Sequence, residues 1–221
     1  MSIELIEETI KRVEKNYRNI LPFDKRDWSL ESLVSTEIMA HTLNSKAFED
    51  FVENWENFLS NIDKFWNQLN AYRKYHAKLD KKEILNGFLG NANKERTTDE
   101  LLVYLDKARN STQHTLWRHL RKSESIEVFA GKGAVIKFLP NGVQVTGVDD
   151  AAKQVTIMFK EGVILLKHIK VVEKGDEVIY ELPTTFFNHK FSPMERVAPQ
   201  IIGLYGLIYY KKLFDEYKSK C

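Results

Sequence analysis

The chain has 221 residues, 43% of them hydrophobic, so it is long enough to bury a core in one large domain or two small ones. Lysine and arginine total 33 against 31 acidic residues, which excludes a bulk polycation that binds nucleic acid over its whole surface. The charged fraction of 29% is ordinary for a globular protein and gives no reason to expect disorder.

The single cysteine, Cys221, excludes an internal disulfide and a cysteine metal site, and it fits a reducing compartment. The first residues lack the basic region and the apolar block of a signal peptide. The most apolar stretch covers residues 201–210, about ten residues, whereas a bilayer span needs about 20. We therefore expect a cytoplasmic protein with no membrane partner.

Apolar residues at helical spacing dominate the first part of the chain. Ser2 can cap a first helix, whose apolar residues recur in steps of three and four as far as Ile20. A second helix is predicted over residues 29–43. A third helix, over residues 45–77, carries a wide aromatic stripe of the kind that a bundle helix buries. The acids between the aromatic residues indicate a solvated face: Glu53, Glu56 and Asp63.

The next stretch, residues 78–96, is polar and contains Gly87 and Gly90, so we predict a connection with one short helical turn. The residues from Thr97 to Glu100 then fit a capping box, in which a threonine and a glutamate three positions later satisfy free backbone amides. A further helix should begin there and run to about Lys122.

After Ser123 the apolar period changes from 3.6 to 2, in short runs that include residues 155–159. Turn signals such as Pro140-Asn141-Gly142 and Lys174-Gly175-Asp176 separate these runs, as in an antiparallel meander. The sequence Ser192-Pro193-Met194-Glu195 predicts the start of a closing helix, which Pro199 should kink or delay.

The predicted fold class is therefore α+β. It has a helical bundle over residues 1–122, followed by an antiparallel β segment with a C-terminal helix over residues 123–221. A β segment of about 60 residues would be marginal alone, so we expect the closing helix to pack back on the bundle.

One short segment has residue types that are typical of a catalytic site: Arg109-Asn110-Ser111-Thr112-Gln113-His114. The spacing Arg-x4-His, with a polar Asn after the Arg, resembles the motif of the HEPN superfamily, whose members are helical bundles. The longer phrase from Leu101 to His114 is also similar to a group of bacterial HEPN-like proteins. The resemblance covers residues 1–122, and the β segment only loosely. Motifs this short depend on their structural context.

In catalytic HEPN proteins this motif implies metal-independent cleavage of RNA by a homodimer with a composite site. By that resemblance His114 acts as the acid or base, Arg109 stabilises the charge on the phosphate, and Asn110 orients either the histidine or the phosphate. The attacking group is the 2′-OH, which DNA lacks, so the mechanism selects RNA. Neither a cofactor nor a metal is expected, and histidines with the spacing of a metalloprotease motif are absent from the sequence.

Further residues near the motif favour a polyanion. Trp117 lies among basic residues and would stack on a base, although a place in the bundle core fits it equally well. Basic residues also complement the dipole at the end of a helix, independently of any ligand. His189, in the loop before the last helix, can fold back towards the site. The basic residues of this predicted contact are Lys107, Arg118, Arg121 and Lys122.

Two other interpretations stay open. Arg109 can pair with an acid such as Asp106 or Glu100, which would make the chain a non-catalytic, dimerising or nucleotide-binding HEPN-like scaffold. The chain can also be an interaction protein built on its β segment. An open basic cleft around Arg109 favours the ribonuclease, and a buried, ion-paired Arg109 favours the scaffold. An exposed apolar patch on the β segment favours the third interpretation.

Overall fold

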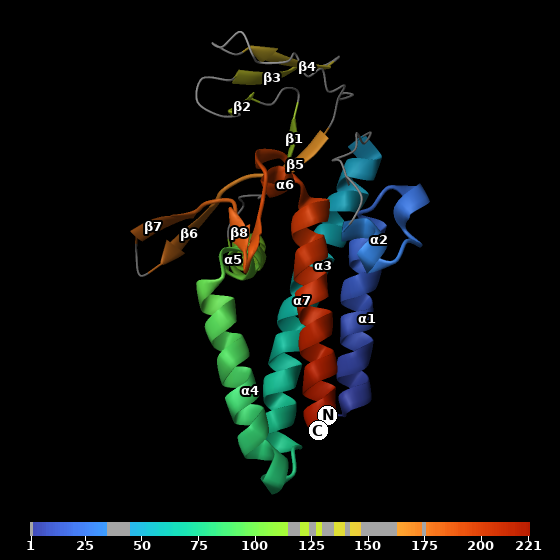
Figure 1. The fold of residues 1–221 in the computed structure, drawn as a ribbon, viewed down its shortest axis with the longest axis vertical. Helices are drawn as coiled ribbons and strands as arrows, with labels where there is room; N and C mark the ends of the chain where they lie inside the picture. The colour runs from blue at the N-terminus through green and yellow to red at the C-terminus, as the bar shows by residue number, and fades with distance from the viewer. Residues whose placement is uncertain are drawn as a thin grey trace.

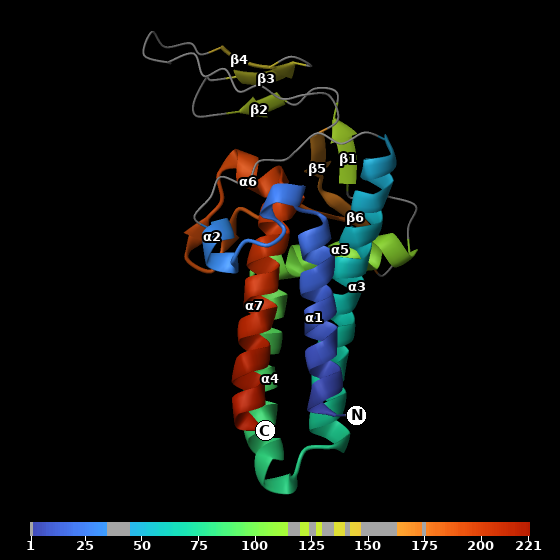
Figure 2. The same ribbon diagram turned by 90° about the vertical axis from the view of Figure 1, so that its right-hand side faces the viewer.

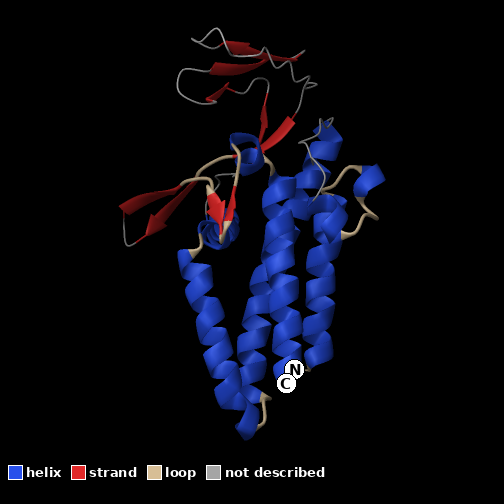
Figure 3. Ribbon diagram, viewed as in Figure 1, coloured by secondary structure: helices blue, strands red, loops and turns tan. Residues whose placement is uncertain are grey.

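The computed structural model describes residues 2–34, 45–114, 120–123, 127–129, 135–139, 142–146, 163–173 and 176–221. Long helices run along the molecule and the strands gather at the end opposite the two termini (Figures 1 and 3). The fold is α+β and mostly helical, as predicted, and it ends in a C-terminal helix. Within the described residues, no helix has both the length and the apolar character that a bilayer crossing requires.

The first helix, α1 (Ile3–Asn19), confirms the predicted cap and apolar face. The Ser2 hydroxyl accepts a hydrogen bond from the backbone of Leu5, and the apolar residues that recur at threes and fours from Ile6 onward are buried. A 3-10 turn, η1 (Phe23–Lys25), and a short helix, α2 (Leu30–Val34), follow. The rest of the second predicted helix, residues 35–44, lies outside the described part of the chain.

The third helix, α3 (Ser45–Tyr75), is 31 residues long and confirms the aromatic stripe. Phe51, Trp55, Phe58 and Phe65 are almost fully buried, and α3 packs along α1. It is the longest helix among the described residues, and its wide apolar face packs into the bundle core (Figure 2).

The connection predicted for residues 78–96 is wrong, because this stretch forms α4 (Leu79–Thr98), a helix of 20 residues. Each glycine inside a helix costs about 1 kcal/mol relative to alanine, and α4 contains Gly87 and Gly90. Tertiary packing outweighs that cost, since Leu85, Leu89 and Ala92 form a buried stripe at helical spacing. The buried stripe, and not the two glycines, determines the conformation of this stretch.

Helix α5 (Glu100–His114) lies across the end of the bundle (Figures 1 and 2), and both of its predicted ends are wrong. Its cap is Asp99, whose Oδ1 accepts from the backbone of Leu101 at 3.0 Å and Leu102 at 3.2 Å, while Thr97 belongs to α4. The helix was expected to reach Lys122, but strand β1 (Leu120–Ser123) begins first. It pairs antiparallel with β5 (Val163–Leu166), which buries Leu120 against the core.

The predicted antiparallel pairing is present, but in separate small sheets among the described residues. Strands β2 (Glu127–Phe129), β3 (Val135–Leu139) and β4 (Gly142–Thr146) pair antiparallel in that order, as in the predicted meander. Pro140 and Asn141 of the predicted turn lie outside the described residues. The predicted run at residues 155–159 lies outside the described residues.

Two antiparallel hairpins follow the β1–β5 pair. The first pairs β6 (Ile169–Glu173) with β7 (Asp176–Tyr180). Lys174 and Gly175 of the turn predicted between them lie outside the described residues. The second is very short and joins β8 (Thr185–Phe186) to β9 (His189–Lys190). Both contain strands that contact α5, so the β segment covers the helix that carries the candidate site.

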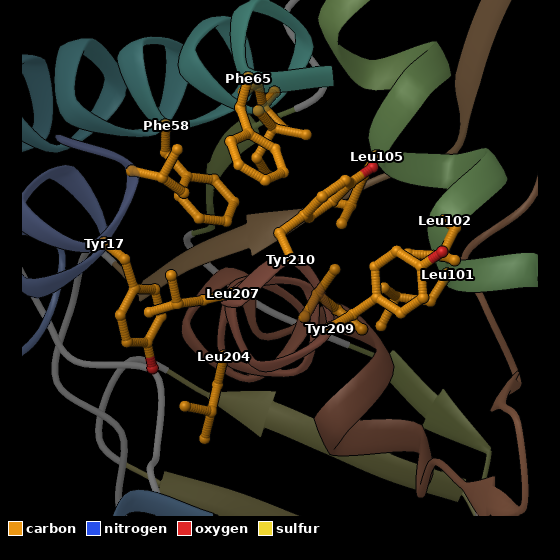
Figure 4. Close-up of a cluster of buried hydrophobic side chains, with 14 of the residues drawn as sticks. Tyr17, Phe58, Phe65, Leu101, Leu102, Leu105, Leu204, Leu207, Tyr209 and Tyr210 are labelled. Carbon is orange, nitrogen blue, oxygen red and sulfur yellow. The ribbon is translucent and has the colours of Figure 1, made fainter. Parts of the chain in front are cut away.

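The closing helices begin as predicted. Ser192 and Glu195 form the capping box of α6 (Pro193–Val197), and Pro199 then starts the long helix α7 (Pro199–Lys220). The side chains of α7 fill the centre of the bundle, between Tyr17 and Phe58 on one side and Leu101 to Leu105 on the other (Figure 4). A Cβ on Gly206 would come 2.6 Å from Leu105 Cδ1, so a larger residue there would require the Leu105 side chain to shift.

Candidate functional site

The candidate site is built on α5, whose inner face is apolar. Leu101, Leu105, Ala108 and Ser111 are buried, with Leu101 and Leu105 facing α7 (Figure 4). Because this face packs against the core, it fixes the orientation of α5 about its own axis. Arg109 and Asn110 then lie at the border of the apolar face, where both are half-buried. Packing of the apolar face therefore decides where the polar residues of the motif lie.

Arg109 is ion-paired. Its Nη2 lies 3.0 Å from Asp63 Oδ2 on α3, and its Nη1 donates to Asn110 Oδ1 at 2.8 Å. The Arg109 side chain is 24% exposed and the Asp63 side chain 22%. The sequence suggests Asp106 or Glu100 as partner and places Asp63 on a solvated face. The described ion pair of Arg109 is with Asp63, from a different helix.

The contacts continue from Asn110 to the centre of the bundle. Asn110 Nδ2 donates to Asp106 Oδ2 at 3.4 Å, and Asp106 Oδ1 accepts from Arg96 Nη2 at 3.1 Å. These side chains link α3, α4 and α5, and we call them the polar row: Asp63, Arg109, Asn110, Asp106 and Arg96.

Arg96 is the most buried member of the polar row, with 9% of its side chain exposed. Its Nε donates to Tyr210 Oη at 3.2 Å, and its guanidinium carbon lies 4.4 Å from the centre of the Trp66 ring. Burial raises the pKa of Tyr210, against the lowering effect of Arg96, so its hydroxyl stays neutral. Arg96 was not singled out by the sequence, because it sits in the stretch taken for a connection.

Lys107, predicted to contact nucleic acid, lies against the β6–β7 hairpin. Its Nζ forms an ion pair with Glu173 and lies 4.8 Å from the centre of the Tyr180 ring. Burial lowers the pKa of Lys107, but the hydrogen bonds to Glu173 and Tyr180 outweigh burial and raise it above the usual value. The Lys107 ammonium is therefore positively charged, and the carboxylate of Glu173 in the hairpin balances that charge.

The remaining predicted residues can be placed only in part. Helix α5 extends to His114, whose side chain lies outside the described part of the structure, as do Trp117 and Arg118. Arg121 and Lys122 belong to strand β1, paired with Leu165 and Ile164 of β5, and their side chains are not among those described. The predicted basic contact therefore does not lie on one continuous helix.

His189 lies in strand β9 and contacts the closing helices. Its ring stacks on Tyr205 with centroids 4.6 Å apart, and its Nε2 lies 3.6 Å from Glu195 Oε1. The ring also meets Phe191 edge to face at 4.8 Å. The described contacts of His189 thus involve Phe191, the β8–β9 hairpin, α6 and α7, whereas the polar row lies on α3, α4 and α5.

No metal-binding group of three or more histidine, cysteine, aspartate or glutamate side chains occurs among the residues with described positions. In comparisons with known proteins, no family model, no curated protein and no solved structure matches this chain.

Proposed function

We propose that this chain is a non-catalytic, HEPN-like helical scaffold, in which Arg109 and Asn110 hold helices of the bundle together. The observation that supports this proposal is the contact of Arg109 with Asp63, reinforced by Asn110. The proposal also rests on the resemblance of the motif from Arg109 to His114.

The charges of the polar row also oppose binding of a phosphate. An arginine that stabilises a phosphate in a transition state needs its donors aimed at the reacting group. Here the two arginines, Arg96 and Arg109, face two aspartates, Asp63 and Asp106, so the formal charge of the row sums to zero. A phosphate that approached Arg109 would have to displace a carboxylate from a half-buried position.

Metal-independent RNA cleavage is the second candidate. Because α5 is helical through Arg109 and His114, the five-residue step between these positions turns through about 140° around the helix axis, so this function requires residues from two copies. In that function His114 would serve as acid or base and Arg109 would exchange Asp63 for the phosphate. Pairing of two copies would supply a composite site, and the RNA would approach the basic residues around β1. Both candidates keep the homodimer and the cytoplasmic location as predictions.

One assay separates the two functions. Purified wild-type protein and the variants His114→Ala and Asp63→Asn are incubated with a mixed RNA pool in EDTA, and the products are resolved on a gel. We expect no cleavage by any of them. Cleavage by the wild type that His114→Ala abolishes, and that Asp63→Asn increases by freeing Arg109, would overturn the scaffold in favour of the ribonuclease.

The proposed scaffold function also predicts an effect on stability, which the same variants test. Asp63→Asn should lower the thermal midpoint, because a structural ion pair is lost. His114→Ala, on α5 at the other end of the motif from Arg109, is the comparison variant and should leave the thermal midpoint unchanged. A protein that is inactive on RNA and loses stability through Asp63 fits a structural motif, whereas unchanged stability would contradict it.

A further inference from the structure

A cavity of about 500 Å³ lies between α4 and α7, beneath the β8–β9 hairpin. Its wall includes Phe88 and Ala92 from α4, Ile208 and Tyr209 from α7, and Phe187 from the hairpin. This volume is within the range of cavities that bind small molecules, which are typically lined by apolar and aromatic side chains with a few polar groups. The residues of the polar row do not line it, so the site is independent of the proposed function.

Aromatic rings form one side of the cavity. The Phe187 ring lies nearly parallel to Tyr209, with centroids 6.1 Å apart and an interplanar angle of 29°. Phe186 meets Phe187 edge to face at 4.8 Å. Phe187 is nevertheless 52% exposed. The Phe187 ring is held by its aromatic neighbours and is partly open to solvent, so a planar molecule can stack on it.

Phe187 has an unusual backbone conformation. Its φ is 47°, in the left-handed region that bulky residues rarely adopt. The backbone N–H of Phe187 donates to Asp99 Oδ2 at 2.9 Å, while Oδ1 of the same carboxylate caps α5. A strained residue persists only where its surroundings fix it, and such residues concentrate at ligand clamps and active sites. The cap of α5 therefore also holds the Phe187 ring at the mouth of the cavity.

The polar groups of the wall carry excess negative charge. Among the residues that line the cavity, the two carboxylates Glu95 and Glu216 outnumber one cation, Lys212, whose Nζ lies 3.9 Å from Glu216 with both side chains largely exposed. A second cation lies close by, since Lys220 Nζ is 5.4 Å from the centre of the Phe88 ring. Glu95 Oε2 accepts from Tyr209 Oη at 3.0 Å. Burial, then the charge of Glu95, raises the pKa of Tyr209, so this phenol stays a neutral donor. Carboxylates beside aromatic faces attract a cation and repel an anion.

We propose that this cavity binds a small planar molecule with a positive charge, such as a protonated aromatic amine. The ring system lies against Phe187 and Tyr209, and the charge lies near Glu95 and Glu216. The shape of the wall selects flat molecules, and the excess of carboxylates selects cations among them.

The test uses three tricyclic fluorescent probes that differ in charge: proflavine as the cation, acridone as the neutral molecule and fluorescein as the anion. Binding to nucleic-acid-free protein is followed by fluorescence anisotropy. We expect proflavine to bind at least about tenfold more tightly than fluorescein, with acridone between them. Equal affinity for proflavine and fluorescein would overturn the charge selection.

Three variants locate the probe. Phe187→Gly removes the ring, and the variant should still fold because glycine adopts a positive φ without strain. Its affinity for proflavine should fall about tenfold. Asn91→Trp places a large side chain at the exposed rim and should block binding. Phe23→Ala removes an aromatic side chain that is 86% exposed elsewhere and should change nothing. Proflavine binding that survives both Phe187→Gly and Asn91→Trp, or that Phe23→Ala weakens equally, would place the probe elsewhere and overturn the proposal.

Discussion

The apolar core around α7 and the polar row beside α5 belong to the same bundle but are held together by different physics. In the core, rings and aliphatic chains such as Tyr17, Phe58 and Leu207 exclude water, and their contribution follows the apolar area that they bury. In the polar row each charge is stabilised by specific partners at fixed distances. Substitutions in the core should therefore lower the free energy of unfolding according to the side-chain volume that they remove. Substitutions in the polar row should lower it according to the partner that they leave unpaired.

The largest expected effect is in the core. Phe58→Ala should lower the free energy of unfolding by about 3–5 kcal/mol, because a fully buried ring is replaced by a cavity. Chemical denaturation of both proteins gives the difference. The matched control is Phe23→Ala, whose exposed ring should contribute no more than about 0.5 kcal/mol. A loss below about 1 kcal/mol for Phe58→Ala would mean that the core around α7 is loosely packed.

A smaller effect is expected in the polar row, where the question is coupling between partners. Arg109→Ala and Asp63→Ala should each destabilise the protein by about 1–2 kcal/mol, since each leaves a half-buried charge without its ion-pair partner. The double variant should lose less than the sum of the two, with a coupling of about 0.5–1.5 kcal/mol. Additive losses would show that the two side chains act independently, and would remove the main support for the scaffold.

The smallest effect concerns the contact between α5 and the β8–β9 hairpin. The side chain of Thr184, then its backbone N–H, donates to Glu100 and holds the pKa of that carboxyl below its usual value. A lowered pKa stabilises the fold above the unfolded value of about 4.3, and this stabilisation is lost as the pH falls through the folded value. Because Glu100 is largely exposed, the effect should be about 0.5 kcal/mol or less.

The pH effect is measured as the difference in thermal midpoint between wild type and Glu100→Gln. The difference should be present at pH 7 and shrink below about pH 4. Glu83→Gln, at an exposed glutamate of α4, serves as the comparison. A difference that grows in acid would have the wrong sign for a lowered pKa and would rule out the assigned contact.

The elements that could be predicted from sequence are those determined by local periodicity. The apolar stripes of α1 and α3, the capping box at Ser192 and the delayed start at Pro199 depend on residues within a few positions of one another. Strand β1, which stops α5 from reaching Lys122, depends instead on pairing with β5, where Leu120 lies opposite Leu166. A partner so distant in sequence leaves no local pattern, so the helix was extended too far.

The polar row shows the same limit for the site. The motif identified Arg109 and Asn110, and the sequence suggested an acid as a staple for Arg109. Choosing Asp63 required knowledge of how α3 and α5 pack, because Asp63 looks like any solvated acid beside an aromatic stripe. Arg96 was missed for the related reason that α4 itself was missed.

The central position of α7 has a consequence for how this chain acquires its structure during synthesis. Helices α1 and α3 emerge from the ribosome long before α7, and their aromatic faces then have no partner in the middle of the bundle. Contacts such as Tyr17 with the backbone of Gln200 join residues far apart in sequence, and contacts of this kind slow folding. Nascent chains that stall before α7 should expose apolar surface, bind chaperones that recognise it, and aggregate when those chaperones are scarce.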